Sequence, residues 1–357
     1  MRLTVKVGSN VLTRPDGLLD ITRLSAIVEQ IAELRAEGHE VLLVSSGSIA
    51  SGRSELRSMH MGKLDAVDVR QLYSAVGQAR LISVYYQLFQ HFGIYAGQVL
   101  TMKENFSTRR HYLNQRNCME VMLQHGVLPI INENDTASVT ELMFTDNDEL
   151  SALVAAMMGC KSLIILTSVD GIFTAPPGSP EAELLREIQP GDSISQYIHP
   201  GKSDFGRGGM LTKSAIARKA AKEGIEVMIA NGKREHILTD LIARRPVPHT
   251  RFAPAPADVN SVKRWLSHSE GFSKGSIALN AHAVERICSP QAASILPVGI
   301  TKVEGQWDKH DLISVFDADG RKIGVGRAEC SADTARALIG QRGQKPVIHC
   351  DYLLLEV

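Results

Sequence analysis

Up to about residue 245, apolar residues recur along the chain in two alternating patterns. Short runs rich in Val, Ile and Leu, such as 3–7, 40–45 and 162–167, have the length and composition of buried parallel strands. Longer segments between them, such as 21–34, repeat apolar residues at the spacing of three and four that is typical of a helix. The same patterns predict helices near 72–92, 109–125 and 213–223, and strands at 94–100, 127–131 and 226–230.

This alternation of strands and helices predicts an α/β fold. Asp20 is a suitable N-cap for the helix at 21–34, and Gly38 is a suitable residue to end it. Repeated strand–helix–strand units form a mostly parallel open sheet that is sandwiched between helices on both faces. Ligands of such sheets bind beyond the carboxyl ends of the strands. The polar and glycine-rich motifs that directly follow several strand runs are therefore expected at one edge of the sheet.

The pattern changes after about residue 245. Four prolines lie between 246 and 256 and predict a stiff, extended linker. Beyond Lys274, short strand-like runs are joined by turns such as Asp319-Gly320, which predicts a small, mainly β domain. We expect a catalytic domain at 1–246, a proline-rich linker at 247–273 and the small β domain at 274–357.

Composition and charge exclude several classes of protein. The 357 residues include 39 Lys and Arg and 39 Asp and Glu, so the whole chain has no excess charge that would require a polyanionic partner. The five cysteines are scattered and include no Cys-x-x-Cys pair, which argues against a disulfide framework or a zinc site. No signal peptide precedes the first strand, and no apolar run reaches the roughly 18 residues of a membrane span. We therefore expect a cytoplasmic protein without a membrane partner.

Two lysines are each associated with a glycine-rich turn. Lys6 lies at the end of the first strand, just before Gly8. Lys213 follows Gly206-Arg207-Gly208-Gly209, which is neither a Walker loop nor a dinucleotide-binding fingerprint. Exposed backbone amides and cations are the groups that position and stabilise a transferring phosphoryl group. These turns therefore favour a small-molecule kinase.

Two acidic runs lie between these lysines. Asn132-Glu133-Asn134-Asp135 follows a buried strand, where neighbouring carboxylates repel each other and favour a bound ligand or a cation. Asp146-Asn147-Asp148 precedes an apolar helix, and one of its residues serves as the N-cap. Because a cap needs only one such residue, we expect a second role. An aspartate between the two lysines would hold both ammonium groups by charge-assisted hydrogen bonds.

Each motif has a structural alternative when it is taken alone. Lys6 could be an edge-strand lysine that extends to solvent. The serines at 45–48 could form an ordinary strand-to-helix turn, and 132–135 could form a solvated loop. The glycines at 206–209 could belong to a surface loop. The twelve histidines are well separated, so we expect no metal site built from protein side chains, and no Gly-x-Ser-x-Gly motif supports a serine hydrolase.

Taken together and in order, these motifs resemble the amino acid kinase family. The combination of 132–135 with 146–148 is similar to the members that act on glutamate, and differs from those that act on acetylglutamate, aspartate or UMP. The segment from Lys274 resembles a PUA domain. Residues 294–300 are similar to a signature of chains that combine such a kinase domain with a PUA domain. The stretches that carry the resemblance of the first domain are 5–9, 44–50, 129–135, 146–152 and 208–213.

The resemblance implies transfer of the ATP γ-phosphoryl group to the side-chain carboxylate of L-glutamate, the first step of proline biosynthesis. It implies that Lys6 and Lys213 stabilise the transferring phosphoryl group and that Asp148 orients both lysines. Mg²⁺ would arrive bound to ATP, so no dedicated metal site is expected. By the same resemblance, Asp135 pairs with the α-ammonium of the substrate. The implied glutamate-binding residues are Ser46, Gly47, Asp135 and Asn147, and the implied ATP-binding residues are Lys6, Gly8, Thr167, Ser168, Arg207, Gly208, Gly209, Met210, Leu211, Thr212 and Lys213.

The resemblance also implies partners and regulation. Relatives are feedback-inhibited by proline, form homodimers or homotetramers, and pass their product to a glutamyl phosphate reductase. The chain departs from the family pattern near the adenine, where Thr167-Ser168 replaces Thr-Asp and Ala175-Pro176-Pro177 replaces Ala-Asp-Pro. These differences concern the ribose and adenine contacts, whereas the phosphate-binding motifs match.

The sequence leaves two other functions open. Another amino acid kinase, such as an acetylglutamate kinase, would not need Asp135 because its substrate lacks a free α-ammonium. An RNA-binding protein acting through the PUA-like domain is the second alternative. However, the segment 274–357 has as many acidic as basic residues, ten of each, so it has no net charge to attract phosphates and nucleic acid is not the expected partner.

Overall fold

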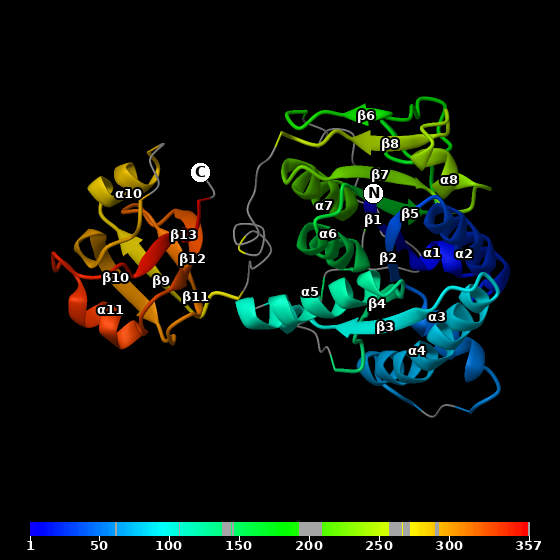
Figure 1. The fold of residues 1–357 in the computed structure, drawn as a ribbon, viewed down its shortest axis with the longest axis horizontal. Coiled ribbons are helices and arrows are strands. Elements are labelled where there is room, and N and C mark those ends of the chain that lie inside the picture. The colour runs from blue at the N-terminus through cyan, green and yellow to red at the C-terminus, as the bar shows by residue number, and fades with distance from the viewer. Residues whose placement is uncertain are drawn as a thin grey trace. The chain divides into compact units, whose positions relative to one another are not determined.

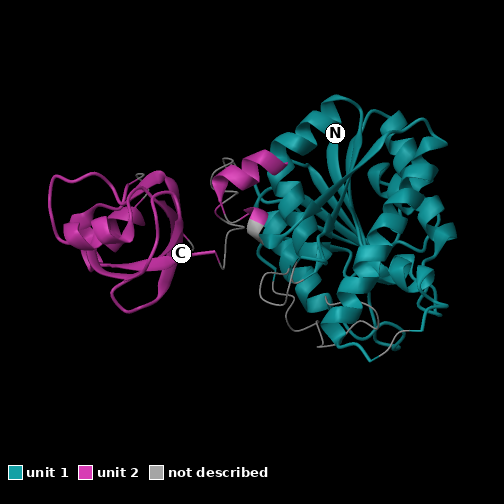
Figure 2. Cartoon of the chain, turned by 90° about the horizontal axis from the view of Figure 1, so that it is seen from below, with its two compact units in different colours: residues 1–103, 116–258 teal, residues 104–115, 259–357 magenta. Residues whose placement is uncertain are grey.

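A large, mostly parallel sheet organises the first part of the chain (Figure 1). The computed structural model describes residues 1–60, 63–106, 108–137, 144, 146–192, 209–256, 266, 272–289 and 293–355. The chain divides into two compact units (Figure 2). The first unit consists of residues 1–103 and 116–258, and the second of residues 104–115 and 259–357.

The sheet of the first unit has eight strands in the order β3-β4-β2-β1-β5-β7-β8-β6. Its neighbouring strands are parallel except for β7 and β8, which are antiparallel. The predicted α/β fold with a mostly parallel sheet is therefore confirmed. The strands are β1 (Arg2–Val7), β2 (Glu40–Ser45), β3 (Ala96–Thr101), β4 (Leu128–Glu133), β5 (Ser162–Thr167), β6 (Glu187–Ile188), β7 (Glu226–Asn231) and β8 (His249–Phe252).

Helices cover both faces of this sheet, which explains why its central strands are apolar on both sides (Figure 1). Leu3, Val5 and Val7 of β1 are fully buried in one hydrophobic core. The helices of the unit are α1 (Ser9–Leu12), α2 (Ile21–Ala36), α3 (Ser48–Glu55), α4 (Ala66–Gln90), α6 (Asn147–Met158), α7 (Met210–Lys222) and α8 (Ile237–Ile242). Two more, η1 (Lys103–Phe106) and α5 (Arg109–Gln124), contain residues of both units.

Side-chain caps fix where two of these helices begin. Asp20 accepts a hydrogen bond from the Arg23 N–H and caps α2, as its position predicted. Asp65 caps α4 in the same way, accepting from the N–H groups of Val67 and Asp68. Helix α4 therefore begins six residues before the apolar pattern that predicted it. Among the described residues, no helix is long and apolar enough to cross a membrane.

The large sheet contains two strands, β6 and β8, that the apolar pattern did not predict. Strand β6 has two residues, too few to leave a periodic pattern. Strand β8 lies inside the segment 247–273, where the prolines predict a linker, yet it pairs with both β7 and β6. Residues 249–252 therefore belong to the large sheet.

The second unit contains a five-stranded sheet in the order β10-β9-β11-β12-β13. The predicted mainly β character of this part is confirmed, and Gly320 adopts a positive φ of 80° in the turn between β11 and β12. Trp307 lies in its core and donates a hydrogen bond from Nε1 to the Cys330 carbonyl. The helices and strands of this second unit are β9 (Gly275–Leu279), α10 (Ala281–Ile287), η3 (Pro297–Gly299), β10 (Ile300–Gly305), β11 (Leu312–Phe316), β12 (Lys322–Ala328), α11 (Ala332–Leu338) and β13 (Ile348–Leu355).

Candidate active site

Lys6 and Gly8 lie where β1 ends, next to the carboxyl end of β5. The Gly8 N–H donates to the Leu166 carbonyl at 3.1 Å. A Cβ atom at position 8 would lie 3.1 Å from that carbonyl oxygen and 3.4 Å from Lys6 Nζ. Glycine therefore allows the backbone to approach β5 closely while the Lys6 ammonium group stays beside it.

Asp148 lies between the ammonium groups of Lys6 and Lys213. Lys6 Nζ is 2.5 Å from Asp148 Oδ1, and Lys213 Nζ is 2.8 Å from Asp148 Oδ2. The Asp148 side chain is fully buried, whereas the side chains of Lys6 and Lys213 are 5% and 11% exposed. The structure thus brings together three residues from β1, α6 and α7 that are far apart in the sequence.

Asp146 provides the N-cap that the acidic run predicted. Its Oδ1 accepts from the N–H groups of Asp148 and Glu149 at 2.9 and 3.1 Å. Its Oδ2 is buried and has no hydrogen-bond partner among the described residues. The cap leaves Asp148 in the first turn of α6, where its carboxylate points toward the lysines and also complements the positive end of the helix dipole.

The pKa values of Asp146 and Asp148 are shifted in opposite directions. Burial on its own would raise the pKa of Asp148, but the nearby ammonium groups of Lys6 and Lys213 outweigh it and lower this pKa to about 2. Burial raises the pKa of Asp146 to about 6, and the negative charge of Asp148 contributes to this increase. Asp148 is therefore the permanently charged partner of the two lysines.

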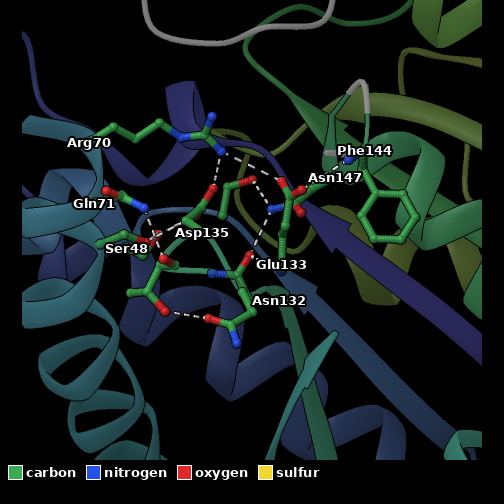
Figure 3. Close-up of polar contacts among 12 residues, drawn as sticks. Ser48, Arg70, Gln71, Asn132, Glu133, Asp135, Phe144 and Asn147 are labelled. Atoms are coloured by element: carbon green, nitrogen blue, oxygen red, sulfur yellow. Dashed lines mark hydrogen bonds and ion pairs between the residues drawn. The ribbon is translucent and has the colours of Figure 1, made fainter. Parts of the chain in front are cut away.

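Ser46, Gly47 and Asn147 lie at the same edge of the sheet. The Ser46 N–H donates to the Val7 carbonyl at 3.0 Å, and Gly47 has a positive φ of 110° at the N-cap of α3. Asn147 Nδ2 donates to Ser46 Oγ at 2.9 Å and to Asn132 Oδ1 at 3.0 Å (Figure 3). Asn147 Oδ1 is buried and has no hydrogen-bond partner among the described residues, so an acceptor is available to a ligand.

Asp135 is buried and is surrounded by donors. Its Oδ2 accepts from Ser74 Oγ at 3.1 Å and from Ser48 Oγ at 3.4 Å, and its Oδ1 forms an ion pair with Arg70 (Figure 3). Arg70 Nη2 also lies 3.8 Å from Glu133 Oε2. The sequence motifs did not identify Arg70 or Ser74 as site residues.

Helix α4 contains a signal that could have identified these residues. Arg70, Ser74 and Gln78 are polar residues at a spacing of four, which places them on one face of the helix. Gln78 Oε1 accepts from Asn132 Nδ2 at 2.7 Å, so all three contact the segment 132–135. A polar row on an otherwise partly buried helix indicates contact with a polar site.

Besides Lys6 and Gly8, the residues that the resemblance assigns to ATP lie in two described segments, 167–168 and 209–213, and at two positions that the structure does not describe. Thr167 ends β5, and its carbonyl accepts from the Gly232 N–H at 2.9 Å; Ser168 follows it. Gly209 is the N-cap of α7, whose first residues are Met210, Leu211, Thr212 and Lys213. Arg207 and Gly208 lie outside the described residues. Beyond β5, Asp170 forms two hydrogen bonds with Arg234 at 2.7 and 2.8 Å.

Comparison with known proteins gives a consistent result along the chain. Residues 1–231 match the model of the amino acid kinase family, and residues 275–349 match the PUA domain model. The chain is 58% identical to a glutamate 5-kinase of Bacteroides thetaiotaomicron, with 99% of this chain and 98% of the relative covered. It is 48% identical to a glutamate 5-kinase of Chlorobaculum tepidum, with 99% and 97% covered.

A third glutamate 5-kinase, from Synechococcus sp., is 39% identical, with 95% of this chain and 91% of the relative covered. Sequence similarity thus extends through both matched domains, and the geometry around Asp148 lies within the first. The chain belongs to the amino acid kinase family and carries a PUA domain.

Proposed function

We propose that this chain phosphorylates the side-chain carboxylate of L-glutamate with ATP and produces L-glutamyl 5-phosphate, the first step of proline biosynthesis. The names of three relatives that match along nearly the whole chain support this activity. The observation that carries it is the buried Asp148, which holds the ammonium groups of Lys6 and Lys213 at one edge of the sheet.

The reaction requires positioning and charge stabilisation. One oxygen of the glutamate side-chain carboxylate attacks the γ-phosphorus of ATP, the bond to the β–γ bridging oxygen breaks, and ADP leaves with that electron pair. The carboxylate is already deprotonated at neutral pH, so no general base is needed. Lys6 and Lys213 stabilise the negative charge of the transferring phosphoryl group, and Asp148 orients both lysines.

Mg²⁺ would accompany ATP and neutralise part of the phosphate charge. Both oxygens of Asp148 pair with lysines, so Asp148 is not the expected ligand. The buried second oxygen of Asp146 has no hydrogen-bond partner among the described residues and is a hard acceptor of the kind that Mg²⁺ prefers. Asp146 is therefore the residue that we expect to bind the ion or one of its waters.

Four residues are proposed to bind glutamate. Asp135 pairs with the α-ammonium group, and the buried acceptor of Asn147 is directed to the same substrate. Ser46 accepts a hydrogen bond from Asn147, and Gly47 is the N-cap of α3, whose N-terminal end favours a carboxylate. We expect Asp135 and Asn147 to make the site selective for the free amino acid over its N-acetylated analogue.

The proposed ATP site lies beside the lysines. Gly8 would let the backbone approach the phosphates, and Thr167 and Ser168 are proposed to contact the nucleoside. The residues 209–213 are proposed to contact the phosphates, as are Arg207 and Gly208, which lie outside the described residues. Asp170, two residues after Ser168, pairs with Arg234 beyond the end of β5. ATP use follows from the family, whereas these individual contacts are proposals.

A substrate panel with chemical trapping tests the proposed function. The purified chain is incubated with MgATP and either glutamate, N-acetylglutamate, aspartate or UMP, and hydroxylamine traps any acyl phosphate as a hydroxamate. We expect a hydroxamate from glutamate alone. A hydroxamate from N-acetylglutamate but not from glutamate would instead support an acetylglutamate kinase, and no product from any substrate would reject the kinase proposal.

Regulation and assembly are further proposals from the resemblance. We expect proline to inhibit the enzyme, the active form to be a homodimer or homotetramer, and the enzyme to act in the cytoplasm. The product carries a reactive acyl phosphate beside an α-amine, so a glutamyl phosphate reductase is the expected consumer. Addition of proline to the hydroxamate assay gives a direct measurement of inhibition.

A further inference from the structure

Tyr85 of α4 brings a hydroxyl group into the apolar core of the first unit. Its side chain is fully buried among core residues, where a phenylalanine ring would fill the same space. The Tyr85 hydroxyl oxygen lies 2.7 Å from Ser45 Oγ at the end of β2, and Ser45 is fully buried as well. Because burying a hydroxyl group is favourable only with a partner, this pair is a specific polar feature of the core.

The direction of this hydrogen bond follows from the second contact of Ser45. Its Oγ lies 2.8 Å from the Ser46 carbonyl oxygen, which can only accept, so Ser45 donates its one hydroxyl hydrogen there. Tyr85 therefore donates to Ser45 Oγ. Since the Ser46 N–H donates to the Val7 carbonyl at 3.0 Å, both backbone groups of Ser46 are held in place.

The fixed Ser46 carbonyl also fixes the direction of the next amide group. The Ser46–Gly47 peptide is trans, so its N–H points away from its C=O and from the buried hydroxyl pair. Among the described residues, none accepts from the Gly47 N–H, and no side chain caps α3. This amide group, at the positive end of the helix dipole, is therefore available to an anion.

The residues on both sides of Gly47 contact residues of the proposed glutamate site. Ser46 Oγ accepts from Asn147 Nδ2 at 2.9 Å. Ser48 Oγ donates to Asp135 Oδ2 at 3.4 Å (Figure 3). The α-carboxylate and the α-ammonium of an amino acid are bonded to the same carbon atom. A substrate whose ammonium group pairs with Asp135 therefore brings its α-carboxylate to this end of α3.

We propose that Ser45 and Tyr85 are positioning residues, whose buried hydroxyl pair directs the Gly47 N–H to the α-carboxylate of the substrate. The proposal rests on the proposed function, because it takes Asp135 as the partner of the α-ammonium. Tyr85 acts through Ser45, and Ser45 acts through the Ser46–Gly47 peptide. The α-carboxylate does not react, so its contact is the same in the ground state and in the transition state, and the pair sets the affinity for glutamate.

The first test compares Ser45→Ala with Ser45→Thr. Alanine removes the hydroxyl group that holds the Ser46 carbonyl, so we expect the glutamate KM to rise about tenfold, the size of one lost hydrogen bond. The values of kcat and of the ATP KM should change less than about threefold. Threonine keeps the hydroxyl group and should hold the glutamate KM within about threefold of the wild-type value. Steady-state kinetics with the hydroxamate assay measure these values, and urea unfolding checks that each variant is folded.

The second test is Tyr85→Phe, which keeps the ring in the core and removes only its hydroxyl group. Ser45 then loses the hydrogen bond that orients it, so we expect the glutamate KM to rise about threefold. Because Tyr85 acts through Ser45, the double variant with Ser45→Ala should have the same KM as Ser45→Ala alone. Tyr86→Phe, at the neighbouring position that is 45% exposed, is the matched control and should leave KM unchanged.

Several outcomes would reject the proposal. An unchanged glutamate KM in Ser45→Ala, or in Tyr85→Phe if the alanine variant does not fold, would assign the hydroxyl pair to packing alone, as would an equal rise in the KM of ATP. A fall in kcat with the glutamate KM unchanged would place the Gly47 N–H on the reacting groups. Losses that add in the double variant would show that Tyr85 does not act through Ser45. If the wild-type chain gives no hydroxamate with glutamate, the proposed function itself has failed before any variant is compared.

Discussion

At the scale of single residues, the central feature of the site is a buried carboxylate that pairs with two lysine ammonium groups. Asp148 is fully buried between Lys6 and Lys213. Such a pair is stabilising only while both partners are present, because an unpaired buried charge is costly. The arrangement therefore fixes two cations at positions where a phosphoryl group gains charge during transfer.

Lys213→Ala tests the catalytic role of one of these cations. Its interaction with the phosphoryl group strengthens in the transition state, so we expect kcat to fall about 100-fold or more while the glutamate KM changes less than about threefold. Steady-state kinetics with the hydroxamate assay measure both values. Lys222→Ala, on the exposed last turn of the same helix, is the control. A large change in KM with kcat intact would contradict this role.

The pKa of Asp146 predicts how stability depends on pH. Its folded-state pKa of about 6 lies above the ordinary value of 3.8, so the folded protein binds more protons than the unfolded chain between these values. The contribution of Asp146 to stability is therefore present at pH 4 and lost as the pH rises through 6. Asp146→Asn keeps an N-cap and should remove this loss, measured by urea unfolding at pH 4.5 and 7. An identical pH dependence in both proteins would contradict it.

Residues of the candidate site differ in how well the sequence could reveal them. Lys6, Asp148 and Lys213 each belong to a short local motif of glycine or acidic residues, and these motifs indicated that they meet. Arg70 and Ser74 lie within a long helix and contact Asp135 only because α4 packs beside that segment. Their role depends on packing between distant segments, which the local pattern does not contain.

At the scale of elements, close packing of α3 against α4 positions the substrate end of the site. A Cβ atom at Gly77 of α4 would lie 1.8 Å from the Ser48 carbonyl oxygen, so only glycine allows this approach. The same packing places Ser48 and Ser74 on one carboxylate oxygen of Asp135. The contact between the two helices therefore has a functional consequence.

Gly77→Ala tests this contact. The added methyl group forces the helices apart, so we expect a loss of about 1–3 kcal/mol in the free energy of unfolding. We also expect a higher glutamate KM, because Ser48 and Ser74 move relative to Asp135. Urea unfolding and steady-state kinetics measure the two effects. Gly191→Ala, where a Cβ atom meets nothing within 4 Å, is the control. Unchanged stability and KM would show that the helices adapt without cost.

Most long elements of the fold were predictable, and short ones were not. The apolar strands β1, β2 and β5 are buried on both faces, so their patterns are strong. Strand β8 has four residues within a proline-rich segment and is stabilised by pairing with β7 and β6. The local sequence pattern contains no information about this pairing. Prolines indicate extended backbone, but they do not distinguish a linker from a short strand.

At the scale of the whole molecule, the chain combines two units with separate hydrophobic cores. The candidate site is built from the first unit, and the PUA domain match lies in the second. The expected domain boundaries at 246 and 274 stay predictions, and β8, at 249–252, pairs within the large sheet beyond the first of them. Balanced charge in the segment 274–357 argues that this part does not recruit nucleic acid by general electrostatic attraction.

Filter binding of the whole chain to a generic RNA tests this view of the second unit. Because ten basic residues are balanced by ten acidic ones in 274–357, we expect retention no greater than that of a neutral control protein at 50 mM salt. Strong retention that falls steeply as salt is raised to 200 mM would instead show a basic surface and revive the RNA-binding alternative.

Transfer of an oxygen label tests the central claim most directly. Glutamate labelled with ¹⁸O in its side-chain carboxylate is incubated with the chain and MgATP, and the product is allowed to cyclise. Attack of the α-amine on the acyl carbon expels phosphate, so the account predicts one ¹⁸O atom in each phosphate that is released. Glutamate-dependent release of phosphate without the label would show that the carboxylate is not the nucleophile and would contradict the account.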